Sequence, residues 1–295
     1  MAQSSSVDTP KVWLITGASS GFGKRLVISV LARGDRVIAT ARSLEKLESI
    51  VSELDAQHAD RVRTLQLDVT DGEEKIKTKI DQAITFWKRI DVLVNNAGFG
   101  FPGMVEEGGT KVLRQQFDTN VFGVLDVTNA TLPYLRESNG CVVVIGSRSA
   151  WKAELPVRFY AASKAAIHAI TETLTTELAQ FNIKVLLVAP GSFRTEGIYG
   201  HSYFTDNPIP AYDKLRQVSE ARFGSISGTE KGDPDKAVKA IVDVVTGEGR
   251  AKGRPWPNYL ILGEDAEIDL KNKYGRLMTV LDEWSDVTRA VNFDS

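Results

Sequence analysis

The sequence predicts an α/β fold, a single doubly wound parallel sheet with helices on both faces. Six short apolar runs alternate with longer amphipathic stretches along the chain. Continuous apolar runs rich in β-branched residues are typical of strands that are buried on both faces. No internal repeat or low-complexity linker interrupts the alternation, which favours one sheet over two domains. We therefore expect residues 11–295 to form one domain after a disordered lead-in at residues 1–10.

Composition narrows the possible partners. The 295 residues contain 36 basic and 38 acidic side chains, so the charge balance predicts neither a nucleic-acid partner nor a membrane-surface partner. Cys141 is the single cysteine and lies within an apolar run, where we expect a small buried side chain and no disulfide. With only three histidines, no metal site is expected. No apolar run reaches the length of a membrane span and residues 1–10 lack a signal-peptide pattern, so we expect a cytoplasmic protein.

The pattern of apolar and polar residues places the elements in order. Strands are predicted at residues 12–16, 36–40, 62–67, 92–94, 142–145, 185–188 and 258–262. Helices are predicted at residues 26–31, 44–54, 73–87, 109–135, 157–181, 212–221, 235–245 and 264–284. Residues 197–210 break the pattern with Gly, Pro, Tyr, Phe and Asn, which suits a substrate lid near residues 195–225. The last helix forms a C-terminal extension.

A glycine-rich turn follows the first strand. Its spacing is Gly17-x-x-x-Gly21-x-Gly23, and an apolar-periodic helix follows. Such a turn directs backbone N–H groups and a helix dipole at a pyrophosphate. The spacing differs from the general G-x-G-x-x-G fingerprint, so a turn without a ligand is the alternative.

The end of the second strand bears on the choice of nucleotide. An NAD site usually has an acidic residue about 20 positions beyond the first glycine, to hold the ribose 2′-hydroxyl. This chain has Thr40-Ala41-Arg42-Ser43 there, without a carboxylate. Arg42 can face a 2′-phosphate, while Ser43 caps the helix that follows. A merely solvated arginine is the alternative.

Polar residues also follow the third and fourth strands. Asp68 can bond an adenine amino group or cap its own turn, and Asn95-Asn96-Ala97-Gly98 forms the next strand end. Ligands of open parallel sheets lie at this edge. Asn120 falls inside a predicted helix, where asparagine is a poor choice and needs a specific reason.

Tyr160 and Lys164 stand four residues apart on a predicted helix, so their side chains share one face. A nearby ammonium favours the phenolate and lowers the pKa of the phenol toward the range of a general acid–base. Alone the motif is weak, because the same spacing occurs on many solvated helix faces.

Together these stretches resemble the short-chain dehydrogenase/reductase family over about residues 11–265. The matching motifs are the glycine turn, Asn95-Asn96-Ala97-Gly98, Asn120, Ser147, Tyr160-x-x-x-Lys164 and Pro190-Gly191 with Thr195. Ser147 precedes Tyr160 by thirteen residues, the usual family separation. The closest likeness is to the subgroup with retinol- and hydroxysteroid-type dehydrogenases and microbial carbonyl reductases. The resemblance implies a Rossmann-type domain that transfers hydride between NADP(H) and the carbonyl or alcohol carbon of a small ketone or aldehyde.

The resemblance also implies the catalytic roles. Tyr160 would donate the proton, Ser147 would bond the same oxygen, and Lys164 would stabilise the tyrosinate and bind the nicotinamide ribose. Asn120 would hold a water that links Lys164 to solvent. The cofactor residues that follow are Gly17, Ser19, Ser20, Gly21, Phe22, Gly23, Arg42, Ser43, Asp68, Val69, Asn96, Ala97, Gly98, Tyr160, Lys164, Pro190, Gly191, Phe193 and Thr195.

Two departures from the family pattern concern the substrate side. Gly146 stands where a second serine is common, and Arg148-Ser149-Ala150-Trp151 is bulkier than usual. Ser149 competes with Ser147 for the serine role, but its spacing to Tyr160 is wrong. An aromatic substrate pocket can be formed by Phe99, Phe101, Trp151, Tyr199, Tyr203 and Phe204, or these residues simply pack.

Other readings stay open. A nicotinamide-dependent epimerase or dehydratase shares Tyr-x-x-x-Lys, but its relatives generally carry a longer substrate domain and a G-x-x-G-x-x-G turn. A non-catalytic NADP(H) sensor usually loses the tyrosine or lysine, and this chain keeps both. The resemblance further implies a homodimer or homotetramer, in which the helices near 109–135 and 157–181 pack against their copies.

Overall fold

The computed structural model describes residues 9–152, 154–155, 157–196, 202–204 and 206–293. Its centre is a seven-stranded parallel sheet in the order β3-β2-β1-β4-β5-β6-β7. The strands are β1 (Val12–Ile15), β2 (Arg36–Ala41), β3 (Val62–Gln66), β4 (Val92–Asn95), β5 (Cys141–Ile145), β6 (Lys184–Pro190) and β7 (Tyr259–Leu262). The order reverses between β1 and β4, which makes a topological switch point at the carboxyl ends of these strands.

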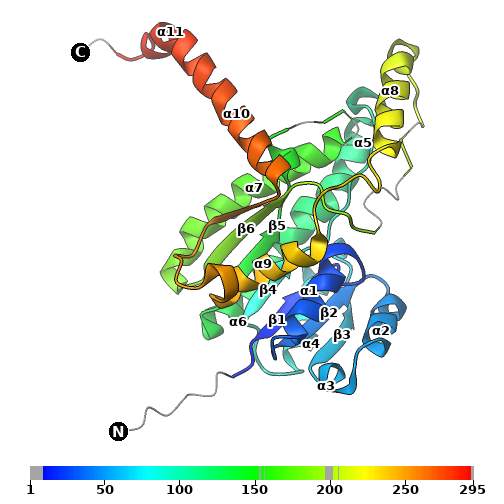
Figure 1. The fold of residues 1–295 in the computed structure, drawn as a ribbon, viewed down its shortest axis with the longest axis vertical. Coiled ribbons are helices and arrows are strands. Elements are labelled where there is room, and N and C mark those ends of the chain that lie inside the picture. The colour runs from blue at the N-terminus through cyan, green and yellow to red at the C-terminus, as the bar shows by residue number, and fades with distance from the viewer. Residues whose placement is uncertain (1–8, 153, 156, 197–201, 205, 294–295) are drawn as a thin grey trace.

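Helices cover both faces of the sheet (Figure 1). One face packs on α1 (Gly21–Leu31), α2 (Leu44–Ser52) and α9 (Pro234–Thr246), and the other on α4 (Glu73–Ile84), α6 (Gly123–Ser138) and α7 (Arg158–Leu178). The predicted doubly wound α/β fold is therefore confirmed. The lead-in at residues 1–8 lies outside the described residues.

Strand β5 shows why the strands are apolar throughout. Cys141, Val143 and Ile145 belong to the core on one face, whereas Val142 and Val144 belong to the core on the other. A strand with helices on both sides has no solvent-facing positions. Cys141 is buried as predicted, and burial raises the pKa of its thiol to about 12.

The long helix predicted at residues 109–135 is instead three segments. Helix α5 (Val105–Phe117) begins earlier and contains a non-helical residue, Gly109, with φ of 53°. A π-helical turn (Asp118–Phe122) follows and continues directly into α6. Asn120 lies in this π-helical turn, a geometry that is frequent at functional sites.

The remaining helices are short or peripheral. They are α3 (Ala56–Ala59), α8 (Asp213–Gly224), α10 (Glu264–Glu283) and α11 (Ser285–Arg289). Figure 1 shows α10 and α11, in orange and red, leaving the sheet as one arm, with α8 beside the carboxyl edge. Within the described ranges, no helix is both long and apolar enough to cross a bilayer.

Candidate active site

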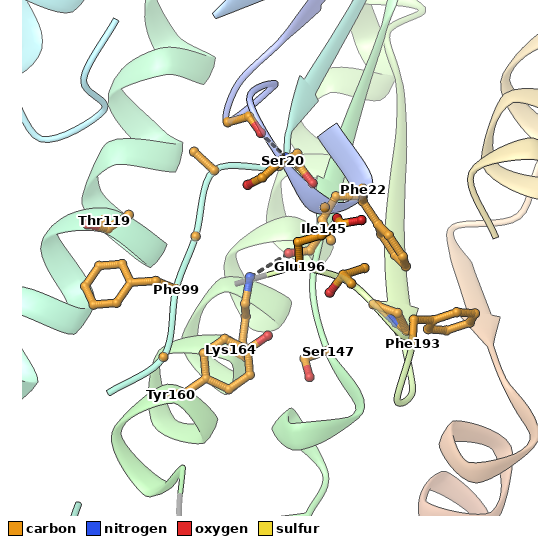
Figure 2. Close-up of a pocket in the computed structure, with 18 of the residues that line it drawn as sticks. Ser20, Phe22, Phe99, Thr119, Ile145, Ser147, Tyr160, Lys164, Phe193 and Glu196 are labelled. Atoms are coloured by element: carbon orange, nitrogen blue, oxygen red, sulfur yellow. Dashed lines mark hydrogen bonds between the residues drawn. The ribbon is translucent and has the colours of Figure 1, made fainter. Parts of the chain in front are cut away.

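A cavity of about 650 Å³ opens at the carboxyl ends of the strands, over the switch point. It is lined by residues from the turns after β1, β2, β3, β4, β5 and β6 and from helices α7 and α8. Of the predicted cofactor and catalytic residues, all line it except Gly23 and Asn120. Figure 2 shows the phenol of Tyr160, Ser147 and the ammonium of Lys164 grouped together, with Ser20 and Phe22 farther along.

The glycine turn after β1 has room only for glycine at two positions. Gly17 has φ of +63°, and an added Cβ would lie 2.8 Å from the Cα of Ala97. At Gly23 an added Cβ would lie 2.2 Å from the carbonyl oxygen of Gly17. The turn therefore closes tightly onto the start of α1 and leaves its backbone facing the cavity. Gly23 shapes the turn from behind, which is why it does not line the cavity itself.

Asn96 holds this turn in place. Its Nδ2 donates to the carbonyl oxygens of Thr16 at 2.9 Å and Gly17 at 3.1 Å. The Thr16 hydroxyl in turn accepts from the backbone N–H groups of Asn96 and Ala97, both at 3.0 Å. The side-chain amide of Asn96 is thus committed to the protein, although the residue lines the cavity.

Two cations lie where β2 passes into α2. Arg42 and Lys46 both line the cavity and are exposed, and in the described part of the chain neither side chain forms a hydrogen bond or ion pair. Ser43 caps α2 as predicted, accepting from the Lys46 N–H at 3.3 Å. The sequence analysis missed Lys46, although its place four residues after Arg42 on the first helical turn was a usable signal. Cationic side chains beside a helix N-terminus are a typical setting for binding a phosphate group.

Asp68 caps its own turn, which was the second of the two roles that the sequence allowed. Its Oδ1 accepts from the backbone N–H of Thr70 at 2.9 Å and from the Thr70 hydroxyl at 2.8 Å. It nevertheless borders the cavity together with Val69. The carboxylate therefore caps its own turn at the edge of the cavity.

Lys164 is buried and reaches across to β5. Its Nζ donates to the carbonyl oxygen of Ile145 at 2.7 Å and lies 5.5 Å from the centroid of the Tyr160 ring (Figure 2). Burial lowers the pKa of the Lys164 ammonium to about 8. The ammonium of Lys164 therefore lies over the ring of Tyr160.

The expectation that Lys164 lowers the pKa of Tyr160 is wrong for this geometry. Burial raises the pKa of the Tyr160 phenol, and the hydrogen bond with Ser147 and the charge of Arg148 only partly oppose this. Withdrawal from water disfavours the phenolate more than these neighbours favour it. At neutral pH the phenol keeps its proton and can donate it.

Ser147, and not Ser149, is the serine at the phenol. The side chain of Ser147 hydrogen-bonds Tyr160, whereas the backbone N–H of Ser149 donates to the Ser147 Oγ at 3.1 Å. Ser149 thus helps to fix Ser147.

Asn120 is fully buried and tied to the loop after β4. Its Nδ2 donates to the carbonyl oxygen of Phe99 at 2.9 Å and to the Ser163 hydroxyl at 3.0 Å, while its Oδ1 accepts from the Phe99 N–H at 3.1 Å. An added Cβ at Gly98 would lie 3.2 Å from the Asn120 Oδ1 and 3.6 Å from the Lys164 Nζ. The π-helical turn therefore brings Asn120 close to Lys164, although Asn120 itself does not line the cavity.

His168 was missed by the sequence analysis and explains Gly146. The His168 Nε2 accepts from the backbone N–H of Ser147 at 3.2 Å, and an added Cβ at Gly146 would lie 2.3 Å from that nitrogen. Trp151 packs edge-on to the imidazole at 5.5 Å. Burial lowers the pKa of His168 to about 3, with a smaller effect from Lys164, so the ring is neutral and can accept. The histidine occupies the volume that a second serine would need.

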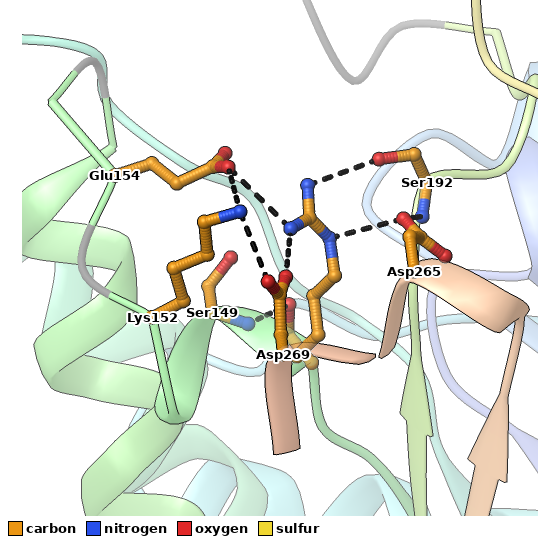
Figure 3. A network of polar contacts seen from close by, with 8 residues as sticks. Ser149, Lys152, Glu154, Ser192, Asp265 and Asp269 are labelled. Carbon is orange, nitrogen blue, oxygen red and sulfur yellow. Dashed lines mark hydrogen bonds and ion pairs between the residues drawn. The ribbon is translucent and has the colours of Figure 1, made fainter. Parts of the chain in front are cut away.

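Arg148 joins the loop after β5 to the C-terminal helix, and Figure 3 shows its partners Glu154, Ser192, Asp265 and Asp269 close together. It pairs with Asp269 and Asp265 of α10, at 3.2 Å for Asp265, and donates to the Ser192 hydroxyl at 3.2 Å. Glu154 lies 3.4 Å away on the other side. The guanidinium is therefore surrounded by carboxylates and does not present free positive charge to a substrate.

The turn after β6 completes the cavity. Asp265 accepts from the backbone N–H of Ser192 at 2.8 Å, and an added Cβ at Gly191 would lie 1.9 Å from the Asp265 Oδ1. Phe193 meets Phe22 edge-on at 5.4 Å. Pro190, Gly191, Phe193 and Thr195, which were predicted as cofactor residues, all line the cavity.

Most of the aromatic residues weighed as a substrate pocket pack within the protein instead, which was the alternative. Of its candidates Phe99 lines the cavity, and Tyr199 lies outside the described residues. Trp151 packs on His168, and the Tyr203 hydroxyl donates to Ser219 at 3.0 Å. Phe204 packs beside Gly103. Phe101 lies edge-on to Phe99 at 4.8 Å. The apolar side chains that line the cavity include Phe99, Val157, Phe223 and Ile226.

Known proteins share these features. The family model described as short chain dehydrogenase matches residues 11–199. An uncharacterized oxidoreductase, YusZ, of Bacillus subtilis is 37% identical over 80% of this chain and 85% of its own length. The 11-beta-hydroxysteroid dehydrogenase 1A of Arabidopsis thaliana is 35% identical over 75% of this chain and 64% of its own.

A solved structure extends the likeness beyond the matched segment. A short-chain dehydrogenase from Streptomyces avermitilis superimposes with a TM-score of 0.83 at 36% identity, covering 97% of this chain and all of its own. The resemblance drawn from the sequence, including the hydroxysteroid-type subgroup, is thereby confirmed. The chain belongs to the short-chain dehydrogenase/reductase family of oxidoreductases, which use nicotinamide cofactors on small-molecule substrates.

Proposed function

We propose that the protein is an NADP(H)-dependent carbonyl reductase or alcohol dehydrogenase of this family. The observation that carries the proposal is the grouping of Ser147, Tyr160 and Lys164 on one wall of the cavity that the glycine turn also lines. The hydroxyls of Ser147 and Tyr160 can both donate hydrogen bonds to a carbonyl oxygen on which negative charge develops. The bound nicotinamide cofactor would supply the hydride or accept it.

In this mechanism Tyr160 is the general acid for reduction. Its proton goes to the oxygen of the carbonyl carbon that receives hydride, and it returns to Tyr160 in the oxidation direction. Ser147 donates a hydrogen bond to the same oxygen and is oriented by Ser149 and His168. Lys164 would stabilise the tyrosinate left behind and bind ribose hydroxyls. Asn120, which lies close to Lys164 at Gly98, would hold a water that links Lys164 to solvent.

The preference for NADP(H) rests on Arg42 and Lys46. Both are cations at the end of β2, where NAD sites carry an acid. A 2′-phosphate would give each an ion pair that a 2′-hydroxyl cannot. Among solved relatives, ElxO with NADP bound has a TM-score of 0.69 at 26% identity over 86% of this chain and 97% of its own.

The substrate is proposed to be a bulky, mainly apolar ketone, aldehyde or alcohol. The wall formed by Phe99, Val157, Phe223 and Ile226 is apolar, and Arg148 is already neutralised by carboxylates. The names of the hydroxysteroid dehydrogenase relative and of a 3-ketodihydrosphingosine reductase from Bacteroides thetaiotaomicron, 36% identical over 67% of each chain, point the same way.

Residues near 195–225 are proposed to act as the substrate lid of the catalytic domain. Thr195 and Glu196 line the cavity at one end of this segment, and Arg222 and Phe223 line it from α8. Helix α8 is held by an ion pair with buried Glu107, in which the Nε of half-buried Arg216 donates to both carboxylate oxygens at 3.0 and 3.1 Å. A homodimer or homotetramer through α6 and α7, in the cytoplasm, stays a prediction from family resemblance.

The test is reduction of a panel of bulky ketones and aldehydes, followed by the absorbance of NADPH. We expect turnover with NADPH for at least one apolar ketone and none in Tyr160→Phe. Loss of NADPH absorbance that is equal in wild type and Tyr160→Phe would contradict the proposal. An epimerase or dehydratase would convert substrate without net oxidation of NADPH.

A further inference from the structure

Arg148 follows Ser147 directly in the chain, and the proposed reaction gives it no role. It lines the cavity, but only 14% of its side chain is exposed, and its guanidinium lies among polar groups from several parts of the chain. These groups are Glu154, the turn after β6 and the first two turns of α10. Figure 3 shows these partners converging from separate segments. Arg148 is therefore the point at which the loop with the serine meets α10.

Asp269 is the buried end of this contact. It lies in the second turn of α10, is 7% exposed, and pairs with Arg148 through Oδ2. Its Oδ1 lies 3.0 Å from the Nζ of Lys152. An ion pair this far from water gains little free energy over apolar packing, because both charges lose their hydration. What it supplies is direction, since the planar guanidinium fork accepts a carboxylate in few orientations. Asp269 therefore fixes Arg148, and with it the backbone next to Ser147.

Asp265 holds the turn after β6 in a similar way. Its Oδ2 accepts from the backbone N–H of Ser192 at 2.8 Å and lies 3.2 Å from the Nε of Arg148. An added Cβ at Gly191 would lie 1.9 Å from the other carboxylate oxygen, so no side chain fits between the turn and Asp265. The Gly191 N–H also donates to the carbonyl oxygen of Leu262 at 2.7 Å. The turn therefore packs directly on the start of α10.

One face of α10 presents both carboxylates. Asp265 and Asp269 are four residues apart on this helix, so their side chains share a face. Arg148 meets both, and its Nη2 donates to the Ser192 hydroxyl at 3.2 Å. The loop with Ser147 and the turn after β6 are thereby held against the same helix. A displacement of about 1 Å between reacting groups can cost about 100-fold in rate, so this common support matters for turnover.

We infer that Asp265 and Asp269 are positioning residues for hydride transfer, which makes the first two turns of α10 part of the active site. The inference rests on the proposed function, because it takes the turn after β6 as the part that holds the nicotinamide. Asp269 acts on Ser147 through Arg148, whereas Asp265 acts on the turn directly. Neither carboxylate is among the described residues that line the cavity, so both act through other residues and not on the substrate.

The first test is the binding of NADPH by calorimetric titration, which needs no substrate. Asp265→Ala removes the acceptor of the Ser192 N–H and should raise the Kd for NADPH about 10- to 100-fold, as expected for the loss of a charged acceptor. Asp265→Asn keeps an oxygen at this place and should recover most of the affinity. The matched control is Glu264→Ala, because the exposed Glu264 carboxylate in the same helical turn forms no hydrogen bond or ion pair in the described part of the chain. An unchanged Kd in Asp265→Ala would overturn the role of Asp265.

The second test is turnover of a bulky ketone at saturating NADPH. Asp269→Asn keeps the shape of the side chain but removes the charge that holds Arg148, so kcat should fall about tenfold or more. The Kd for NADPH should stay near its wild-type value, because Asp265 still holds the turn after β6. Lys152→Met removes the other partner of Asp269 and leaves Arg148 in place, so this control should keep the wild-type kcat. A wild-type kcat in Asp269→Asn would contradict the role of Asp269.

The third test asks whether Asp269 acts through Arg148. Arg148→Met should lower kcat at least as much as Asp269→Asn, and the double variant should be no slower than Arg148→Met alone. Losses that multiply in the double variant would show two independent effects and would overturn this path. Arg148→Lys keeps the charge but not the fork that reaches Asp265, Asp269 and Ser192 together, so kcat should fall here too. It takes the place of Arg148→Met in the cycle if that variant does not fold.

Failure of this inference is distinguishable from failure of the proposed function. If the wild type oxidises no NADPH, or if Tyr160→Phe is as fast as the wild type, the proposed function fails, and the titration of Asp265→Ala still tests the role of Asp265. If wild-type turnover depends on Tyr160 and the variants of Asp265 and Asp269 match the wild type, the inference alone is wrong.

Discussion

The imidazole of His168 accepts a hydrogen bond from the backbone N–H of Ser147 at 3.2 Å, so a helix residue two turns beyond Tyr160 fixes the loop that carries the serine. Its other nitrogen, Nδ1, is buried and has no partner among the described residues. The ring is held between Trp151 and Tyr259, at 5.5 and 6.2 Å. His168 therefore acts as a neutral acceptor that positions Ser147.

Replacing His168 tests this role. His168→Leu leaves the Ser147 N–H unpaired, which costs about 1–3 kcal/mol and loosens the serine. We expect kcat to fall about tenfold or more while KM for NADPH stays near its wild-type value. His168→Gln retains an acceptor and should recover much of the loss. Equal losses in both variants would mean that only the packing of the ring matters.

Gly146 and His168 should be coupled. Gly146→Ala puts a methyl group 2.3 Å from the His168 Nε2, so the ring must shift and the serine with it. We expect a lower free energy of unfolding and lower kcat. The double variant Gly146→Ala/His168→Ala should relieve this contact. Urea unfolding of the single and double variants should therefore give a coupling energy of about 0.5–3 kcal/mol. Additive effects would show that the two residues do not meet.

The free energy of unfolding should decrease as pH falls below 6.5, because of the same histidine. The pKa of His168 is lowered from 6.5 to about 3 by burial, then by Lys164, so folding requires the neutral ring. The contribution of the neutral ring to the free energy of unfolding is complete above pH 6.5 and is lost as pH falls toward 3. The slope approaches about 1.4 kcal/mol per pH unit within that window. Urea unfolding of wild type against His168→Gln between pH 4 and 7 measures it, and parallel curves would contradict the assignment.

These residues also show what the sequence can and cannot predict. Gly17, Ser147, Tyr160 and Lys164 were found because their chemistry depends on local spacing at strand ends and on one helix face. His168 continues that face by four residues, but its partner is a backbone N–H 21 positions earlier, which no local pattern reveals.

The π-helical turn was missed for a similar reason. An asparagine at position 120 of a predicted helix indicated that this position has a specific role. That role is to hydrogen-bond the backbone of Phe99, whose carbonyl oxygen accepts from the Asn120 amide and whose N–H donates to it. One extra residue per turn leaves almost no trace in the apolar periodicity. The buried pair of Glu107 and Arg216 likewise depends on a contact over 109 positions.

That pair should control the lid. Glu107→Gln leaves Arg216 with Asp213, at 2.8 Å, but removes the buried charge that fixes α8. Losing the charge of Glu107 removes the ion pair that Arg216 forms with it and loosens the packing of α8. We expect a higher KM for the carbonyl substrate, with NADPH affinity unchanged. Glu106→Gln, which affects the neighbouring exposed contact with Tyr212, is the control.

Cofactor preference should depend on the two cations after β2. Arg42→Ala should weaken the binding of NADPH by about 10- to 100-fold, because a charge-assisted contact contributes about 1.5–3 kcal/mol. Lys46→Ala should weaken it less, since its flexible ammonium is a point charge. NADH affinity should barely change in either variant. A wild type that binds both nucleotides equally would contradict this role of Arg42.

The reaction itself depends on the phenol of Tyr160. Tyr160→Phe keeps the ring over Lys164 but removes the proton donor and the hydrogen bond with Ser147, so folding and NADPH binding should persist. General acid–base catalysis is worth about 10²–10⁴-fold, and losing stabilisation of the developing oxyanion adds to that. Lys164→Met should differ by also weakening NADPH, because its ammonium would contact the ribose. Single-turnover reduction at saturating NADPH separates the two, and a near-normal rate in Tyr160→Phe would rule out this mechanism.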